Sequence, residues 1–286
     1  MSQKLITATT AEINATIVMH PAFKKAFDGI LKLIHLNSLS EVPFGGAVIA
    51  PSGCGKSSLI KCIKQHFPNS SLFQEGSSCL SVSAEANTNI GHLVSKLMKQ
   101  LGYQTIVRAS TLYEQSALLA EALKERKVIA VFIDESQHIS RGKRTLSAAA
   151  ITDWIKQLSD ASGVVMIMLG TRDFIPLSQS NDQLSSRAPA AFTMSEFQCD
   201  EMWQGLLKQF AETVKSFDLT PAYKNFSKKL HRATAGTPRT LKQLLIASSI
   251  VGLQAGRKVL DQESLKHGYD QVFGSNPQIG NMFNDE

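Results

Sequence analysis

Residues 48–57 constrain this chain most, because an apolar run breaks there into a turn that ends in Gly55, Lys56 and Ser57. Such a turn points successive backbone N–H groups inward at the start of a helix, where unpaired donors and the helix dipole favour an anion. Lys56 is then expected to reach the β- and γ-phosphates of a nucleotide, and Ser57 to bind Mg²⁺. The amphipathic stretch 58–67 fits the helix that follows such a loop. The segment therefore predicts a phosphate-binding loop between a strand and a helix.

The loop matches the pattern G-x-x-x-x-G-K-[ST] except at its first position, where the chain has Ala50. Alanine costs little there if the backbone keeps a negative φ angle. Short Gly-Lys-Ser strings also arise by chance, so the apolar residues before the loop and the amphipathic residues after it carry much of the prediction. ATP or GTP is expected to contact Pro51, Ser52, Gly53, Cys54, Gly55, Lys56, Ser57 and Ser58.

The composition is that of a folded protein without a membrane segment. At 286 residues with 43% hydrophobic residues, the chain can form one large domain and a smaller one. It has no apolar run near the ~18 residues of a membrane helix, and its first residues lack a secretory signal. We therefore expect a cytoplasmic protein without membrane contact. The net charge of +6 is compatible with a polyanionic partner but does not establish one.

The hydrophobic pattern divides the chain into an α/β part and a helical part. Short apolar runs first alternate with longer helical patterns, which predicts a parallel sheet covered by helices. The expected strands are residues 46–50, 79–83, 128–133, 164–169 and 191–194, and the expected helices are residues 56–67, 90–101, 111–125 and 147–159. Helices without intervening strands are then expected at residues 200–217, 221–234, 240–255 and 261–273. The predicted parts are a lead segment 1–40, an α/β core 41–198, a helical domain 199–273 and a flexible tail 274–286.

The predicted strand at residues 128–133 is followed by two carboxylates, Asp134 and Glu135. Ligands of open α/β sheets bind at the C-terminal ends of the strands. Asp134 is expected to bind Mg²⁺ through its water shell, and Glu135 to orient and deprotonate the attacking water. An acidic strand end can instead cap the next helix, but its place downstream of a phosphate-binding loop favours the catalytic interpretation.

Three further polar residues are candidates for contacts with the γ-phosphate. Thr171 follows a predicted strand and is placed to sense this group, although threonine is also a common turn residue. Arg187 precedes the last predicted strand, and Arg239 ends a Gly-Thr-Pro-Arg motif that opens a helix. The planar guanidinium of arginine suits the charge that spreads over γ-phosphate oxygens. Surface arginines are usually solvated or paired, so the order of the motifs carries these two assignments.

Together, these motifs resemble the ordered signature of AAA+ ATPases, which are α/β P-loop proteins with a parallel sheet and a small C-terminal helical lid. Residues 50–57 correspond to Walker A, residues 134–135 to Walker B and Thr171 to sensor 1. Arg187 corresponds to the arginine finger and Arg239 to sensor 2. The resemblance implies that Arg187 acts on the nucleotide of an adjacent protomer, whereas the other residues act within one protomer.

Within that superfamily the chain is similar to the TniB/TnsC group, the ATP-dependent regulators of Tn7-like and Tn5053-like transposons. The similarity rests on the helical lid and on residues 20–23, 133–138, 154–158, 169–172 and 182–187. The group implies a Mg²⁺-dependent ATPase that assembles as a hexameric ring or helical filament on double-stranded DNA. It also implies contacts with a TniQ-like target-selection protein and a DDE transposase of the TnsB/TniA type, with ATP hydrolysis driving disassembly.

The same resemblance implies that duplex DNA is held through its backbone phosphates, which lysine, arginine and small hydroxyl donors contact without reading bases. The candidate contacts are Lys99, Thr105 and Arg108 between two predicted helices, and Arg141, Lys143 and Arg144 in the loop after Asp134 and Glu135. Neither group has interleaved aromatic residues, so stacking on single strands is not expected. A solvated basic loop is the alternative interpretation of each group.

Two other functions are also compatible with these sequence features. A nucleotide-gated secretion or pilus ATPase would share the phosphate-binding loop, but a membrane partner rather than DNA would stimulate it. A helicase-loader-like ATPase would bind a hexameric helicase.

Overall fold

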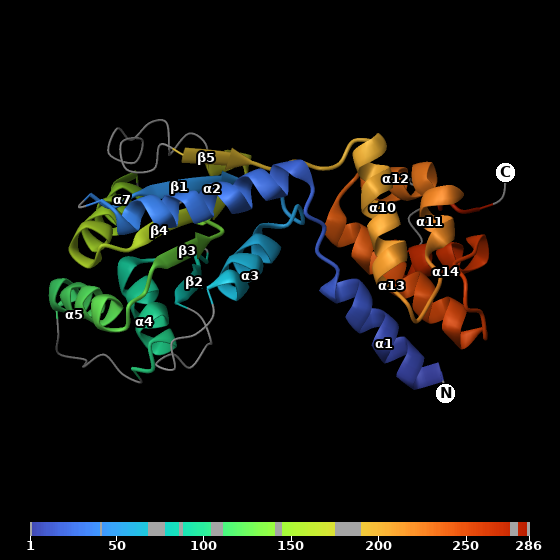
Figure 1. Ribbon diagram of the computed structural model, residues 1–286, viewed down its shortest axis with the longest axis horizontal. Coiled ribbons are helices and arrows are strands. Elements are labelled where there is room, and N and C mark those ends of the chain that lie inside the picture. Colours follow the sequence, from blue (N-terminus) through green and yellow to red (C-terminus); the bar gives the residue numbers. More distant parts are fainter. Residues whose placement is uncertain are drawn as a thin grey trace. The chain divides into compact units, whose positions relative to one another are not determined.

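The computed structural model describes residues 2–40, 42–67, 78–85, 88–103, 111–140, 145–174, 190–274 and 280–284. It divides into two compact units (Figure 1). The α/β unit is Pro21–Met194, and the helical unit combines Met1–His20 with Ser195–Glu286.

The α/β unit is built on a parallel five-stranded sheet with the order β2-β3-β4-β1-β5. Its strands are β1 (Gly45–Ile49), β2 (Cys79–Ser83), β3 (Ala130–Asp134), β4 (Val165–Gly170) and β5 (Ala190–Thr193). The described residues of β1 and β4 are buried throughout, as expected for strands covered on both faces. The order places β4 between β1 and β3, so the C-terminal ends of these three strands are neighbours. The predicted parallel sheet is confirmed, with strand ends that shift by one or two residues.

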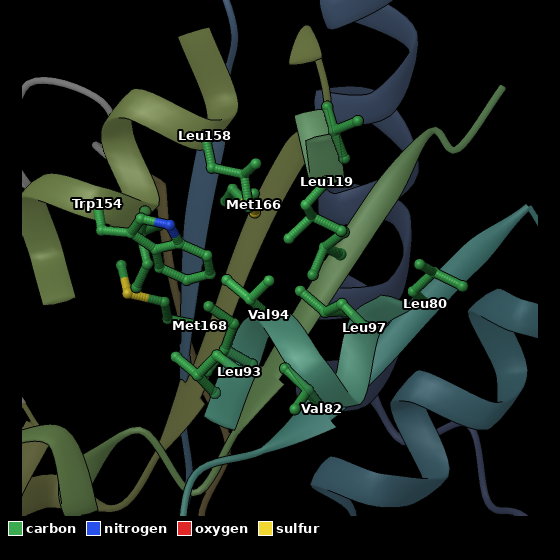
Figure 2. Packing of buried hydrophobic residues seen from close by; sticks show 14 of the residues in the cluster. Leu80, Val82, Leu93, Val94, Leu97, Leu119, Trp154, Leu158, Met166 and Met168 are labelled. Carbon is green, nitrogen blue, oxygen red and sulfur yellow. The ribbon is translucent and has the colours of Figure 1, made fainter. Parts of the chain in front are cut away.

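Helices cover both faces of this sheet (Figure 1). They are α2 (Pro21–Ser38), α3 (Lys56–His66), α4 (Ile90–Gln100), α5 (Leu112–Glu125), α6 (Gln137–Ser140) and α7 (Thr145–Ser162), with a 3₁₀ turn at Arg172–Phe174. Helices α4, α5 and α7 pack on one face, and Figure 2 shows Leu93, Leu97 and Trp154 directed at residues of β2 and β4. Helix α2 lies on the other face, where a Cβ at Gly46 would come 2.9 Å from Leu33 Cδ1. Alternate residues of a strand therefore face opposite sides of the sheet.

The helical unit has its own core around the fully buried Trp203. Its helices are α1 (Ser2–Ala15), α10 (Glu201–Thr213), α11 (Thr220–Lys224), α12 (Ser227–Thr234), α13 (Pro238–Gln254) and α14 (Gln262–Phe273). Helices α13 and α14 approach closely because Gly268 has no side chain; a Cβ there would lie 2.7 Å from the Ser248 nitrogen. The buried leucines of α13 belong to the same hydrophobic cluster as Trp203 and Phe210.

The first 40 residues do not form a single segment. Helix α2 belongs to the α/β unit, whereas α1 packs against α10 and α13 in the helical unit. One cause is Glu12, whose carboxylate accepts hydrogen bonds from the backbone N–H groups of Lys215 at 2.7 Å and Ser216 at 3.1 Å. The observed units therefore divide near residues 20 and 194, where the sequence predicted boundaries at 40 and 198.

The stretch 221–234, expected as one helix, forms two. The backbone N–H groups of Asn225 and Phe226 both donate to the carbonyl of Pro221, at 2.8 and 3.0 Å, which ends α11 after one turn. Helix α12 then starts at Ser227, whose side chain is buried. This break could not be predicted from local helical propensity, because the position of the break depends on how the chain packs around Trp203.

No helix in the described part of the chain combines the length and apolar character needed to cross a membrane.

Candidate nucleotide-binding site

The phosphate-binding loop predicted from sequence links β1 to α3. Gly53 and Gly55 have φ angles of 83° and 98°, a left-handed conformation that favours residues without a Cβ. Ala50, the departure from the motif, is not among the described residues with positive φ. Its N–H donates to the carbonyl of Gly170 at 2.9 Å, so it continues the pairing of β1 with β4. The alanine is therefore accommodated without strain.

Lys56 begins α3, and its side chain is turned back into the loop. The Nζ atom donates to the carbonyl oxygens of Ala50 at 2.8 Å and Pro51 at 3.2 Å, and the residue is only 5% exposed. A buried ammonium attracts an anion strongly, and the dipoles of these two carbonyl partners do not neutralise its charge. The loop thus combines a cation with the N-terminus of an eleven-residue helix.

Asp134 ends β3 and lies beside the loop. The Ser57 hydroxyl donates to Asp134 Oδ2 at 3.5 Å, across one intervening strand of the sheet. Burial raises the pKa of the Asp134 carboxyl, and the negative charge of Glu135 adds to this shift. Hydroxyl and carboxylate oxygens are hard ligands of the kind that Mg²⁺ prefers. These two groups are also close enough together to bind the same ion. Cation binding there would oppose the raised pKa, since it favours the ionised carboxylate.

Glu135 marks a sharp turn out of β3. Its φ angle is 56°, an uncommon value for a residue with a side chain, and its N–H donates to Asp134 Oδ1 at 2.9 Å. The turn is held by Ser136, whose N–H donates to Leu169 at 2.8 Å and whose hydroxyl donates to Ile133 at 2.8 Å. Backbone outliers of this kind concentrate at functional sites. Here the turn presents a half-exposed carboxylate at the edge of the sheet.

Thr171 follows β4, between the two motifs. Its Oγ1 atom is buried and has no hydrogen-bond partner among the described residues. Its backbone N–H donates to the side-chain oxygen of Gln137 at 3.2 Å. The structure thus brings together the loop after β1, the carboxylates after β3 and the threonine after β4. Gln137 was missed by sequence reasoning, because nothing in its local pattern distinguishes it from a helix-starting glutamine.

Arg239 lies in the other unit, exposed in the first turn of α13. The preceding Gly236 has a φ angle of 67°, and a Cβ there would come within 2.0 Å of the Phe197 carbonyl oxygen. The Phe197 N–H donates to Gly236 at 3.0 Å, and His231 Nε2 lies 2.8 Å from the Phe197 oxygen. The Gly-Thr-Pro-Arg motif is thus a fixed entry into α13.

The structure describes only some of the remaining predicted residues. Lys99 is exposed near the end of α4. The predicted arginine finger and the other candidate DNA contacts lie outside the described residues; they are Arg187, Thr105, Arg108, Arg141, Lys143 and Arg144.

Comparison with known families decides the identity of the fold and the family. The family model described as bacterial TniB protein matches residues 11–198, more than half of the chain. The chain belongs to the TniB family. This confirms the predicted TniB/TnsC resemblance, and the matched TniB region contains the loop, both carboxylates and Thr171. No curated protein matches the chain.

Solved structures similar to this TniB-family chain share its AAA+ ATPase fold. The ORC2 protein of Aeropyrum pernix, in ADPNP-ADP complexes, gives a TM-score of 0.68 at 13% identity over 93% of this chain and 72% of that chain. Cdc6p from Pyrobaculum aerophilum gives 0.67 at 14% identity, covering 92% of this chain and 71% of that chain. The A. pernix ORC1 protein in complex with DNA gives 0.65 at 12% identity, covering 90% and 66%. The predicted AAA+ ATPase core with a C-terminal helical region is confirmed at the level of fold.

Proposed function

We propose that this TniB-family chain binds and hydrolyses ATP at the C-terminal edge of its sheet. The observation that carries the proposal is the meeting of Ser57 and Asp134, 3.5 Å apart, beside the buried ammonium of Lys56. Cation ligands and a phosphate-binding cation then lie together, although they come from segments that are distant in the sequence. The ADPNP-ADP complexes of the ORC2 protein, which has the same fold, support nucleotide as the ligand.

Each residue has a distinct part in the proposed reaction. Lys56 and the N–H groups at the start of α3 bind the β- and γ-phosphates, which neutralises charge as the terminal phosphate departs. Glu135 orients the attacking water and takes its proton. Thr171 Oγ1, which has no hydrogen-bond partner among the described residues, is suited to donate to a γ-phosphate oxygen or to the water. Arg239 is assigned as sensor 2 and Arg187 as a finger acting on a neighbouring protomer, following the AAA+ resemblance.

The donor atoms present also fit a magnesium ion. The Ser57 hydroxyl and the Asp134 carboxylate would hold it, Asp134 through water. Thr171 Oγ1, buried without a partner in the described part of the chain, also favours a polar ligand nearby. When bound, Mg²⁺ supplies charge stabilisation on the β- and γ-phosphate oxygens. Asp134 must be ionised for this task, and Glu135 is left uncoordinated to act on water.

The biological role that we propose is regulation of transposition in the cytoplasm. The ATP-bound protein would assemble as a ring or helical filament on double-stranded DNA, linking a TniQ-like target-selection protein to a DDE transposase. Hydrolysis would then disassemble it. Family membership, the net charge of +6 and the DNA complexes formed by ORC proteins of this fold support the proposal. Lys99 is an exposed candidate for a phosphate contact.

The test has two parts. ATP hydrolysis is measured with and without duplex DNA, and the protein is imaged by electron microscopy with DNA and a non-hydrolysable ATP analogue. We expect Mg²⁺-dependent hydrolysis and DNA-dependent rings or filaments. Hydrolysis without any assembly on DNA would refute the role in transposition while leaving the ATPase in place. Absence of nucleotide binding would refute both.

A further inference from the structure

The side chain of Gln137 joins two parts of the candidate site. Gln137 is the first residue of α6 and is only 4% exposed. Its amide nitrogen donates a hydrogen bond to Glu135 Oε2, and its amide oxygen accepts one from the Thr171 N–H at 3.2 Å. One buried carboxamide therefore connects the carboxylate after β3 to the backbone after β4.

The local sequence makes room for this connection. A Cβ on Gly170 would lie 3.3 Å from Gln137 Oε1 and 2.7 Å from Phe174 Cβ, so glycine lets the carboxamide reach the end of β4. The turn at Glu135 and Ser136 brings the chain back across this strand end, since the Ser136 N–H donates to Leu169. Gln137 is thus held by contacts on both sides, and these contacts fix the orientation of its side-chain amide.

We propose that Gln137 is a positioning residue for ATP hydrolysis, which holds one oxygen of Glu135 so that the other faces the attacking water beside Thr171. The inference rests on the proposed ATPase function and adds Gln137 to the residues that take part in it. A free glutamate side chain samples several rotamers, and a general base acts only from within hydrogen-bond reach of the water. Fixing Oε2 removes most of that freedom, because the donor is itself fixed to Thr171.

The chemistry of this link requires an amide. Only a group with one donor end and one acceptor end can satisfy a carboxylate and a backbone N–H at once. A glutamate at the same position would keep the acceptor for Thr171 but would place a negative charge against Glu135. A methionine would keep the length and fill the space without either hydrogen bond.

The experiment compares Gln137→Met and Gln137→Glu with the parental full-length protein. We expect kcat for ATP hydrolysis to fall about tenfold to a hundredfold in both variants, as supporting residues of a catalytic group typically cost. Affinity for a fluorescent ATP analogue should change less than about threefold, because Gln137 bonds to Glu135 and Thr171, whereas the phosphates and Mg²⁺ are expected at Lys56 and Ser57. An unchanged kcat, or an increased one, in either folded variant would overturn the inference.

Gln100→Met is the matched control. The Gln100 carboxamide also joins two groups, donating to the Ser81 carbonyl at 2.7 Å and accepting from the Ser81 N–H at 3.3 Å, but it lies beside β2. Its loss removes the same kinds of bond away from the nucleotide, so kcat should stay at the parental value. An equal fall of kcat in this control would show that Gln137 acts through general stability and would overturn the inference.

A double-mutant cycle separates positioning from other effects. If Gln137 acts through Glu135, then Gln137→Met should cause no further loss of turnover in a Glu135→Gln background. Additive losses would overturn the inference. The proposed function fails separately, since in that case the parental protein itself would not hydrolyse ATP.

Discussion

The two units of this protein differ in where residues with positive φ angles lie. In the α/β unit, Gly53, Gly55 and Glu135 have positive φ angles, and all three lie where the sheet edge forms the candidate site. In the helical unit, Ala235 and Gly274 have positive φ angles at the ends of helices. The α/β unit also has such residues just after helices, as Lys127 is after α5, but it places others in the phosphate-binding loop and at the turn after β3.

This difference predicts two kinds of mutational effect. Changes at the sheet edge should reduce activity and leave stability nearly intact, because the groups there face a ligand. Changes in the helical core should reduce stability and leave nucleotide affinity intact. Trp154 in the α/β core and Trp203 in the helical core are the only two tryptophans, so single-tryptophan variants can follow each unit separately by fluorescence.

The largest effect is expected for Lys56→Ala. Loss of the ammonium removes charge-assisted bonds to the phosphates, so nucleotide affinity should fall by about a hundredfold or more, with hydrolysis undetectable. Calorimetry with ATP measures the affinity, and thermal unfolding should show a nearly unchanged melting temperature. Lys61→Ala, an exposed lysine on the same helix, is the control and should bind ATP normally. Normal binding by Lys56→Ala would contradict the loop assignment.

A loss of turnover alone is expected for Glu135→Gln. The amide cannot accept the proton from water, so kcat should fall by about 10²- to 10⁴-fold, while Asp134 and the loop still bind ATP. Single-turnover hydrolysis and nucleotide affinity are measured together. Because ATP is retained, assemblies on DNA should persist longer than those of the parental protein. Parental turnover in this variant would place the base elsewhere.

In the helical unit, Gly268→Ala should act on stability alone. The new methyl group would clash with the Ser248 backbone, so the free energy of unfolding should fall by about 1–3 kcal/mol, reported by Trp203 in urea. Gly205→Ala is the matched control, because open space surrounds a Cβ there and alanine favours the helix by about 0.5–1 kcal/mol. A large loss of ATP affinity in Gly268→Ala would break the distinction between the units.

The smallest effect concerns the docking of α1 through Glu12. Burial acts to raise the pKa of this carboxyl, but hydrogen bonds from Ser216 and Lys215 outweigh it and hold the pKa below its usual value of 4.5. A lowered pKa means that the contribution is present above pH 4.5 and is lost as the pH falls through the folded-state value. Glu12→Gln should cost about 0.5–1 kcal/mol near pH 7 and little in acid.

Urea unfolding of the parental and Glu12→Gln proteins across pH measures this difference. Glu212→Gln serves as the control, since that carboxylate is exposed and pairs with Lys208 at 3.8 Å. Its stability difference from the parental protein should be small throughout. A Glu12→Gln difference that is equally large in acid would show that ionisation of Glu12 has no part in holding α1.

The sequence predicted most of the residues at the C-terminal edge of the sheet, but it did not predict which of them contact one another. Strands and the phosphate-binding loop carry strong local signals, since apolar runs and obligatory glycines are set by backbone geometry. The helix that starts at Pro21 was missed because its residues were grouped with the lead segment, and the break near Asn225 depends on tertiary packing. Gln137 was missed because its role arises only from the approach of β3 to β4.

By itself, the sequence predicted the fold class, the family resemblance and the residues proposed to bind phosphate and metal. Their chemistry is local: Lys56 and Asp134 have the same functional groups in any fold. The tertiary structure alone decided that Ser57 and Asp134 meet, that Gln137 bridges Glu135 to Thr171, and that α1 joins the C-terminal helices. Such contacts depend on strand order and helix packing, which bring together segments that are far apart in the chain. No periodic pattern in the sequence reveals them.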